Sequence, residues 1–215
     1  MSSQISSNLQ NITAQIDASC SKVGRTPNVS ILAATKGRSI EQIKEAASLG
    51  ITLFGENYLQ EAEKKITAFP NMEWHFIGHL QSNKAKKAVE LFNCIQSVDS
   101  AKLASKISDA AEKPFPIFLE VNIGSEESKF GVLPENIPSF YNEVKDLPNL
   151  AIRGLMCMAP FIDKEQTRSY FQNMKQLAQQ LSLKELSMGM SNDYPIAIEE
   201  GATIVRLGTV LFGAR

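Results

Sequence analysis

The sequence predicts an α/β protein, built as a single (β/α)8 TIM-type barrel with an extra N-terminal helix. Three observations support this. Eight short apolar segments each precede a helical pattern or a turn, a separate helical pattern comes before the first of them, and no Pro- or Ser-rich linker divides the 215 residues. Strict alternation of strands and helices is typical of parallel sheets covered by helices. A doubly wound open sheet shares this alternation and is the alternative. We expect residues 1–215 to form one domain.

The extra helix is predicted over residues 3–22. Its apolar residues Ile5, Leu9, Ile12 and Ile16 recur at steps of three and four, which places them on one helical face. A glycine and a proline follow, and they end the helix before the first strand.

The remaining elements follow from apolar runs and from the glycines and prolines that end helices. The predicted strands are 29–36, 52–56, 73–79, 94–98, 116–123, 151–158, 185–190 and 203–207. The predicted helices between them are 40–49, one ending at 68, 83–92, 100–112, 135–146, 164–181 and 193–200.

The first strand ends in a lysine. Residues 29–35 are apolar or small, Lys36 and Gly37 follow, and Ser39 with Gln42 forms a capping-box pattern that starts the next helix. Ligands of α/β folds bind at the carboxyl ends of strands. A poorly solvated lysine amine loses its proton more readily and can then form a Schiff base. The alternative is a lysine that simply extends into solvent.

Several other chemically capable residues come at predicted strand ends, which gather on one face of a barrel. They are Glu56, Asn57, His79, Asp99, Asn122, Met156 to Met158, Ser191, Asn192, Arg206, Gly208 and Thr209. Of these, His79 and Met156 are expected to line the pocket.

The ends of the last two strands resemble a phosphate cradle. Gly189–Asn192 precedes a helix start, and Gly208 with Thr209 follows the eighth strand. Barrels often bind phosphate between these two loops, where glycine lets the backbone approach the anion. The alternative is that the glycines only form turns. Arg206 shares a strand face with Gly208, so it either points toward the cradle or forms a structural ion pair with a carboxylate such as Glu56.

Several classes of function lack support. The net charge of −1 gives no argument for nucleic acid, and the three scattered cysteines favour neither a disulfide framework nor a zinc site. His75 and His79 are four residues apart but lie on a strand, so no metal site is predicted, and His75 is expected to be a hydrogen-bonded core residue. The polar N-terminus and the absence of an apolar run of about 18 residues indicate a cytoplasmic protein without a membrane segment.

Two further segments are polar. The basic segment Ser82–Lys87 is expected to be a solvated face, with an anion or partner site as the alternative, and Gly124–Gly131 could cover the mouth of the barrel.

Six motifs appear in an order that is similar to a known family. They are Ala34–Lys36, Phe54–Glu61, Trp74–Lys84, Arg153–Met156, Leu186–Ser191 and Val205–Thr209. Together they resemble the pyridoxal phosphate homeostasis protein family, also called the proline synthase co-transcribed protein family, from about residue 5 to Arg215. Two departures are small: Asn192 stands where Asp or Ala is commoner, and Gly37 with Arg38 replaces a Thr/Val-rich form.

The resemblance implies a barrel similar to the N-terminal domain of bacterial alanine racemase, with pyridoxal 5′-phosphate (PLP) as cofactor. It implies that Lys36 holds PLP as a Schiff base and that Ser191, Gly208 and Thr209 hold the phosphate. Arg206 would face the pyridine nitrogen, and Asn57 would lie near the ring.

A cationic arginine at the pyridine nitrogen disfavours protonation of the ring and weakens its action as an electron sink. The sequence also shows no second β domain after the eighth strand. We therefore expect a PLP carrier or regulator that acts in PLP homeostasis, with PLP-dependent apo-enzymes as partners and little or no turnover. One alternative is a PLP-dependent amino-acid racemase, with Tyr58 or Tyr194 as the second base. Another is a cofactor-free Schiff-base lyase acting on a sugar phosphate.

Overall fold

The computed structural model describes residues 3–163 and 165–214. The strands are β1 (Ser30–Ala34), β2 (Leu53–Glu56), β3 (Glu73–Phe76), β4 (Cys94–Val98), β5 (Phe115–Val121), β6 (Leu150–Cys157), β7 (Glu185–Ser187) and β8 (Ile204–Leu207). The helices are α1 (Gln4–Lys22), α2 (Ile40–Ser48), α3 (Leu59–Ala68), α4 (Ala85–Leu91), α5 (Ala101–Ala110), α6 (Ile137–Val144), α7 (Arg168–Gln180), α8 (Tyr194–Glu199) and α9 (Thr209–Phe212). Short 3-10 helices, Ser82–Lys84 and Pro134–Asn136, lead into α4 and α6.

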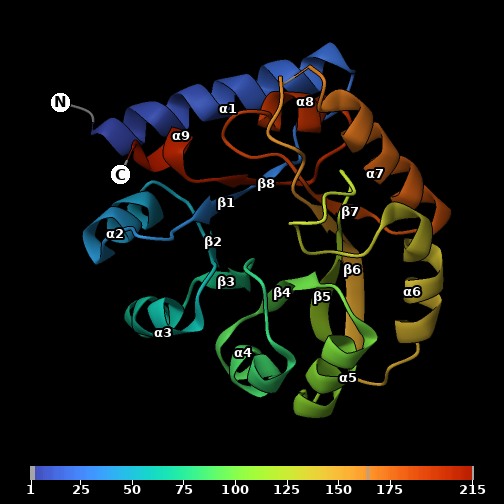
Figure 1. The fold of residues 1–215 in the computed structure, drawn as a ribbon. Coiled ribbons are helices and arrows are strands. Elements are labelled where there is room, and N and C mark those ends of the chain that lie inside the picture. Colours follow the sequence, from blue (N-terminus) through green and yellow to red (C-terminus); the bar gives the residue numbers. More distant parts are fainter. Residues whose placement is uncertain (1–2, 164, 215) are drawn as a thin grey trace.

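The eight strands form a closed parallel barrel in chain order (Figure 1). Closure comes from β8 pairing with β1, with Ser30 opposite Ile204 and Leu32 opposite Arg206. This confirms the predicted (β/α)8 barrel and excludes the open doubly wound sheet. None of the described helices combines the length and apolar character that a membrane span requires.

The predicted N-terminal helix is present as α1, and it joins the two ends of the chain. It lies along α8 and α9 (Figure 1). Asn8 Nδ2 donates to the carbonyl of Leu211 over 2.9 Å, and Lys22 Nζ donates to Glu199 over 2.8 Å. The first helix therefore fastens the last βα unit of the barrel.

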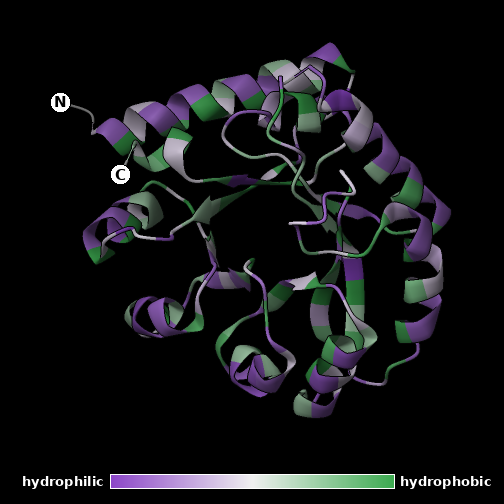
Figure 2. Cartoon of the chain, viewed as in Figure 1, coloured by the Kyte–Doolittle hydropathy of each residue, from purple (hydrophilic) through white to green (hydrophobic). Residues whose placement is uncertain are grey.

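Apolar side chains fill two layers. Between the sheet and the helices lies the larger one, in which Phe54 and Trp74 stack with ring centroids 5.1 Å apart. Inside the barrel a smaller cluster packs, formed by Leu32, Leu53, Ile77, Cys94, Phe118, Met156 and Ile204. Hydrophilic and hydrophobic residues alternate along the surrounding helices, as expected for helices with one face against the sheet (Figure 2).

Two strands end three residues earlier than predicted. β3 ends at Phe76 rather than 79, and at Gly78 the chain lies so close to Asn57 that a Cβ would be 2.2 Å from the Asn57 carbonyl oxygen. β7 ends at Ser187 rather than 190, because Gly189 has a φ of +90° and turns the chain away from the sheet. The helix α9 was not predicted at all.

Candidate functional site

Lys36 lies two residues beyond Ala34, the last residue of β1, in the turn that leads to α2. Thr35 is buried and donates its backbone N–H to the carbonyl of Gly55, so the turn is fixed to β2. Gly37 has a φ of +68°, which lets the chain reverse, and Ser39 forms the predicted capping box of α2. The side chain of Lys36 is partly buried, and its Nζ donates to Tyr58 Oη over 3.1 Å. The strand-end position of Lys36 is thus as predicted.

A buried ion pair supports this strand end. Glu56 is fully buried, and Lys65 Nζ on α3 lies 2.5 Å from its Oε1 and 2.5 Å from the carbonyl oxygen of Thr35. Burial raises the pKa of Glu56, and the hydrogen bond from Lys65 opposes that shift. The sequence analysis missed Lys65. Its only local signal is Glu61, four residues earlier, with which Lys65 also pairs over 2.6 Å.

The loops after β7 and β8 are joined by a hydrogen bond. Ser191 Oγ accepts the backbone N–H of Val210 over 3.3 Å. Gly208 lies against β1, since a Cβ placed on it would be 3.6 Å from the carbonyl oxygen of Ala34. The predicted cradle residues therefore meet beside the strand that carries Lys36.

A cavity of about 530 Å³ opens at this place. Its described lining residues come from β1, from the β5–α6 and β6–α7 loops and from the last two units: Ala34, Lys129, Met158, Ala159, Pro160, Phe161, Ile162, Thr167, Met190, Ser191, Asn192, Asp193, Arg206, Gly208 and Thr209. The cavity thus brings together four of the predicted site residues, and its volume suits a small ligand.

Arg206 reaches into the barrel from β8 and is only 5% exposed. One Nη donates to the carbonyl of Ser187 over 2.7 Å and to its hydroxyl over 2.9 Å, and the other donates to the carbonyl of Cys157 over 2.7 Å. Burial lowers the pKa of Arg206 from its high ordinary value, but a guanidinium keeps its charge in proteins. These hydrogen-bond partners of Arg206 are neutral groups, and Glu56 pairs with Lys65 instead.

The structure places a carboxyl group near this arginine that sequence reasoning missed. Glu120 on β5 is 3% exposed, and its Oε2 has no hydrogen-bond partner among the described residues. Burial raises the pKa of Glu120 to about 7, the charge of Asp99 adds to the rise, and Arg206 opposes it. The available signal was a glutamate flanked by apolar residues within a predicted strand.

Lys36, Asn57, His79 and Met156 are not among the described residues that line this cavity. Asn57 is partly buried where its backbone contacts Gly78. Met156 is fully buried in the apolar interior of the barrel, while Met158 lines the cavity. His79 is partly exposed and stacks on Phe130 with ring centroids 3.6 Å apart.

His79 contacts the loop that was expected to cover the mouth. The loop is held by Asn122, whose Nδ2 donates to the carbonyls of Glu126 and Lys129. In the basic segment, Lys87 pairs with Glu63 over 2.9 Å. Within the described ranges, no group of three or more His, Cys, Asp or Glu side chains is placed to hold a metal ion.

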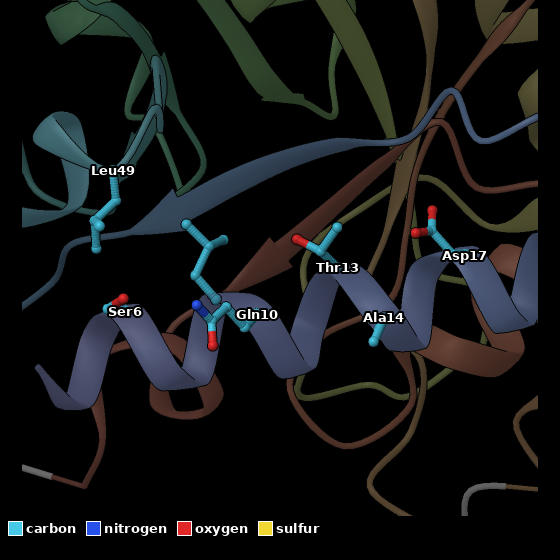
Figure 3. A pocket seen from close by; sticks show the side chains of 7 residues that line it. Ser6, Gln10, Thr13, Ala14, Asp17 and Leu49 are labelled. Atoms are coloured by element: carbon cyan, nitrogen blue, oxygen red, sulfur yellow. The ribbon is translucent and has the colours of Figure 1, made fainter. Parts of the chain in front are cut away.

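A second cavity, of about 520 Å³, lies along α1 (Figure 3). Ser6, Gln10, Thr13, Asp17 and Leu49 are among its lining residues (Figure 3). Its lining contains no lysine or glycine, so it does not match the predicted chemistry. The cavity at the carboxyl ends of the strands is therefore the candidate functional site.

A closed parallel barrel with a lysine at the end of the first strand, and an arginine and glycines at the last, defines a class of barrel proteins related to amino-acid racemases. A family model described as alanine racemase, N-terminal domain, matches residues 7–215. The chain belongs to this family, and within it to the pyridoxal phosphate homeostasis proteins, which confirms the resemblance found in the sequence.

Two relatives illustrate the match. The pyridoxal phosphate homeostasis protein of Pseudomonas aeruginosa is 41% identical, over 99% of this chain and 96% of its own length. PipY of Synechococcus elongatus, solved with PLP bound, is 36% identical with a TM-score of 0.83, over 98% of this chain and all (100%) of that chain. An alanine racemase of Clostridium difficile shares the fold at 15% identity, with a TM-score of 0.74, and this chain covers 56% of its length.

Proposed function

We propose that this protein binds PLP at the carboxyl face of the barrel, through a Schiff base on Lys36, and acts in PLP homeostasis as a single-domain carrier. The observation that carries the proposal is the position of Lys36 two residues after Ala34, which lines the cavity together with Ser191, Arg206, Gly208 and Thr209. Membership of the pyridoxal phosphate homeostasis family, and the PLP in the PipY structure, support it.

The residues present suit the parts of PLP. The hydroxyls of Ser191 and Thr209 and the open backbone at Gly208 suit a phosphate group. Arg206 brings a permanent cation for the side of the ring nitrogen, and Asn57 would lie near the ring. The amine of Lys36 is partly exposed, so an aldehyde can reach it.

The same residues support binding with little turnover. When bound, PLP supplies an aldehyde for Lys36 and a ring that can withdraw electrons from an amino acid. Arg206 would donate at the position of the ring nitrogen and cannot accept a proton, so it would keep that nitrogen unprotonated and the electron withdrawal weak. The protein therefore holds the cofactor rather than using it.

The racemase alternative needs a second proton-carrying group on the substrate face opposite the lysine. Tyr58 Oη is hydrogen-bonded to Lys36 itself, so the two groups share one side. Tyr194 is 7% exposed within the apolar core, where burial raises the pKa of its hydroxyl. These positions support the carrier over the racemase. Loss of α-deuterium from amino acids at useful rates, abolished by Lys36→Ala, would reverse that preference.

The first experiment is a visible absorbance spectrum of the protein with added PLP, followed by borohydride reduction and peptide mass mapping. We expect a yellow protein and a pyridoxyl mass on the Lys36 peptide. Lys36→Ala should remove both signals, whereas Lys44→Ala, which changes an exposed lysine on α2, should keep them. A colourless protein that stays unmodified would overturn the proposal and favour the sugar-phosphate lyase.

Delivery to PLP-dependent apo-enzymes is the partner interaction that we propose. Two aromatic side chains are exposed at the mouth, Phe130 at 52% and Phe161 at 90%. Recovery of an apo-enzyme's activity should be faster with PLP-loaded protein than spontaneous PLP release allows, and equal rates would argue against delivery. We also infer that the protein acts in the cytoplasm, which its three free, buried cysteines support.

A further inference from the structure

A chain of hydrogen bonds crosses the interior of the barrel and ends at Arg206. Arg206 Nη1 donates to Ser187 Oγ over 2.9 Å, and Ser187 Oγ donates to Gln96 Oε1 over 2.6 Å. Gln96 Nε2 lies 2.7 Å from His75 Nδ1, and His75 Nε2 lies 2.9 Å from Glu73 Oε1. The chain thus connects β8, β7, β4 and β3.

The donor-to-acceptor direction of these hydrogen bonds follows from the two residues at their ends. Arginine can only donate, and an ionised carboxylate can only accept. Every member between Arg206 and Glu73 therefore donates toward Glu73. This assigns the proton of neutral His75 to Nε2, because Nδ1 accepts from Gln96. The hydrogen bond from His75 lowers the pKa of Glu73, so Glu73 is a carboxylate at neutral pH.

Such a chain is costly in an apolar interior unless each member is paired. Ser187 and Gln96 are fully buried and His75 is 1% exposed, within the cluster of apolar side chains inside the barrel. Burying a polar group without a hydrogen-bond partner is unfavourable. The three side chains hydrogen-bond to one another in sequence. Because the Ser187 hydroxyl donates to Gln96, its oxygen is held in an orientation that accepts from Arg206.

The two ends of the chain lie near opposite mouths of the barrel. Arg206 lines the candidate cavity at the carboxyl end. His75 and Glu73 line a cavity of about 360 Å³ on the amino side, together with Arg153 and Glu185, which pair over 2.7 Å. The half-exposed carboxylate of Glu73 at the amino-side mouth is therefore connected through hydrogen-bonded side chains to Arg206 at the opposite mouth.

We propose that Ser187, Gln96 and His75 act as positioning residues, which hold the guanidinium of Arg206 in the orientation that it presents to the cofactor site. This rests on the proposed function in one respect, that PLP is the ligand which Arg206 faces. Two backbone carbonyls also accept from Arg206, so the competing explanation is that they suffice and that the three side chains only fill the core.

The first measurement needs no cofactor. Nitrogen-15 NMR of the histidine rings should show His75 as the neutral Nε2–H tautomer. Ser187→Ala should speed the exchange of the Arg206 Nη protons with water. An Nδ1–H tautomer in the wild type, or unchanged exchange of the Arg206 Nη protons in Ser187→Ala, would overturn the positioning role of these side chains whether or not PLP binds.

The second measurement is a PLP titration followed by the absorbance of the bound cofactor. Ser187→Ala and Gln96→Leu should bind PLP about tenfold more weakly, as expected for the loss of one hydrogen bond to a charged group, and should shift its absorbance maximum. Gln96→Glu keeps an acceptor for Ser187 and should restore binding if Gln96→Leu folds poorly, as judged by circular dichroism.

The matched control is Ser97→Ala. Ser97 is also buried on β4, but its Oγ has no hydrogen-bond partner among the described residues, so its loss should leave the affinity and the spectrum unchanged. Wild-type affinity and spectrum in Ser187→Ala and Gln96→Leu would show that the carbonyls suffice and would overturn the proposal. If the wild type itself bound no PLP, the proposed function would fail. The NMR measurement would still decide whether Ser187, Gln96 and His75 hold Arg206 in place.

Discussion

Lys65 Nζ lies 2.5 Å from Glu56 Oε1, beneath the strand ends that carry Lys36 and Asn57. Both partners are buried, and the same ammonium donates to the carbonyl of Thr35. The pair therefore links α3 to β1 and β2 directly under the proposed cofactor site.

Removing one partner of this pair should be strongly destabilising. Lys65→Met leaves the Glu56 carboxylate buried without its cation, and we expect a loss of about 3 kcal/mol in the free energy of unfolding. Urea unfolding measures it. Lys64→Met, at the exposed neighbouring position, should cost less than about 0.5 kcal/mol. Adding Glu56→Gln to Lys65→Met should recover part of the loss; no recovery would argue against an unpaired charge as the cause.

Arg206 and Ser191 should affect PLP in different ways. Arg206→Ala removes the cation that we propose for the ring nitrogen, so it should shift the absorbance of bound PLP more than Ser191→Ala does. Ser191→Ala removes a hydroxyl that we propose for the phosphate side and should mainly weaken affinity. Titrations followed from the visible spectrum separate the two effects. Wild-type titrations from both variants would refute both roles.

Gly208→Ala tests the cradle with little effect on the fold. A Cβ at this position would meet only ordinary contacts, at 3.6 Å and 3.7 Å from Ala34, and the residue has a negative φ of −112°. We expect the free energy of unfolding to change by less than about 1 kcal/mol. PLP binding should weaken, because the methyl group fills space at the cavity wall. Gly78→Ala is the contrast, since its Cβ would clash with the backbone of Asn57 and the variant should unfold readily.

Glu120 should make stability fall as pH rises. Its folded pKa of about 7 lies above its ordinary value of 4.5, so the folded protein binds the proton more tightly than the unfolded chain does. The contribution is fully present below about pH 4.5 and is lost as pH rises through 7, on the order of 3 kcal/mol in all. Glu120→Gln should therefore gain stability over the wild type at pH 8 but not at pH 4.5, as measured by urea unfolding.

The exposed glutamate Glu143 on α6 supplies the control for this measurement. Glu143→Gln should leave the difference between the two pH values as in the wild type. An equal pH dependence in the wild type and Glu120→Gln would show that the Glu120 carboxyl is not the source.

The sequence predicted the order of the elements and the position of Lys36 because both depend on local patterns. Apolar runs, end signals and the capping box at Ser39 act within a few residues. His75 was predicted as a hydrogen-bonded core histidine, and its bonds to Glu73 and Gln96 confirm this. The strand ends at Phe76 and Ser187 depend instead on close backbone approach and on a glycine in the left-handed region.

Partners that are distant in sequence could not be predicted. Gln96 meets Ser187 across 91 positions of the chain, and nothing within either strand specifies that pairing. The inward position of Lys65 could not be predicted for the same reason. Its acceptors Thr35 and Glu56 come from other segments of the chain than its own helix. Met156 lies within β6 and Met158 just beyond its end, and no local pattern distinguishes the methionine in the core from the one that lines the cavity.

The contact between α1 and the last unit has a consequence for how the protein is made. Asn8 reaches Leu211 across 203 positions, and β8 must pair with β1 before the barrel closes. During synthesis the first helix and Lys36 leave the ribosome long before Arg206 and Gly208 exist. The lysine that we propose to bind PLP is thus made before the loops after β7 and β8, so the candidate cavity can form only once β8 has emerged.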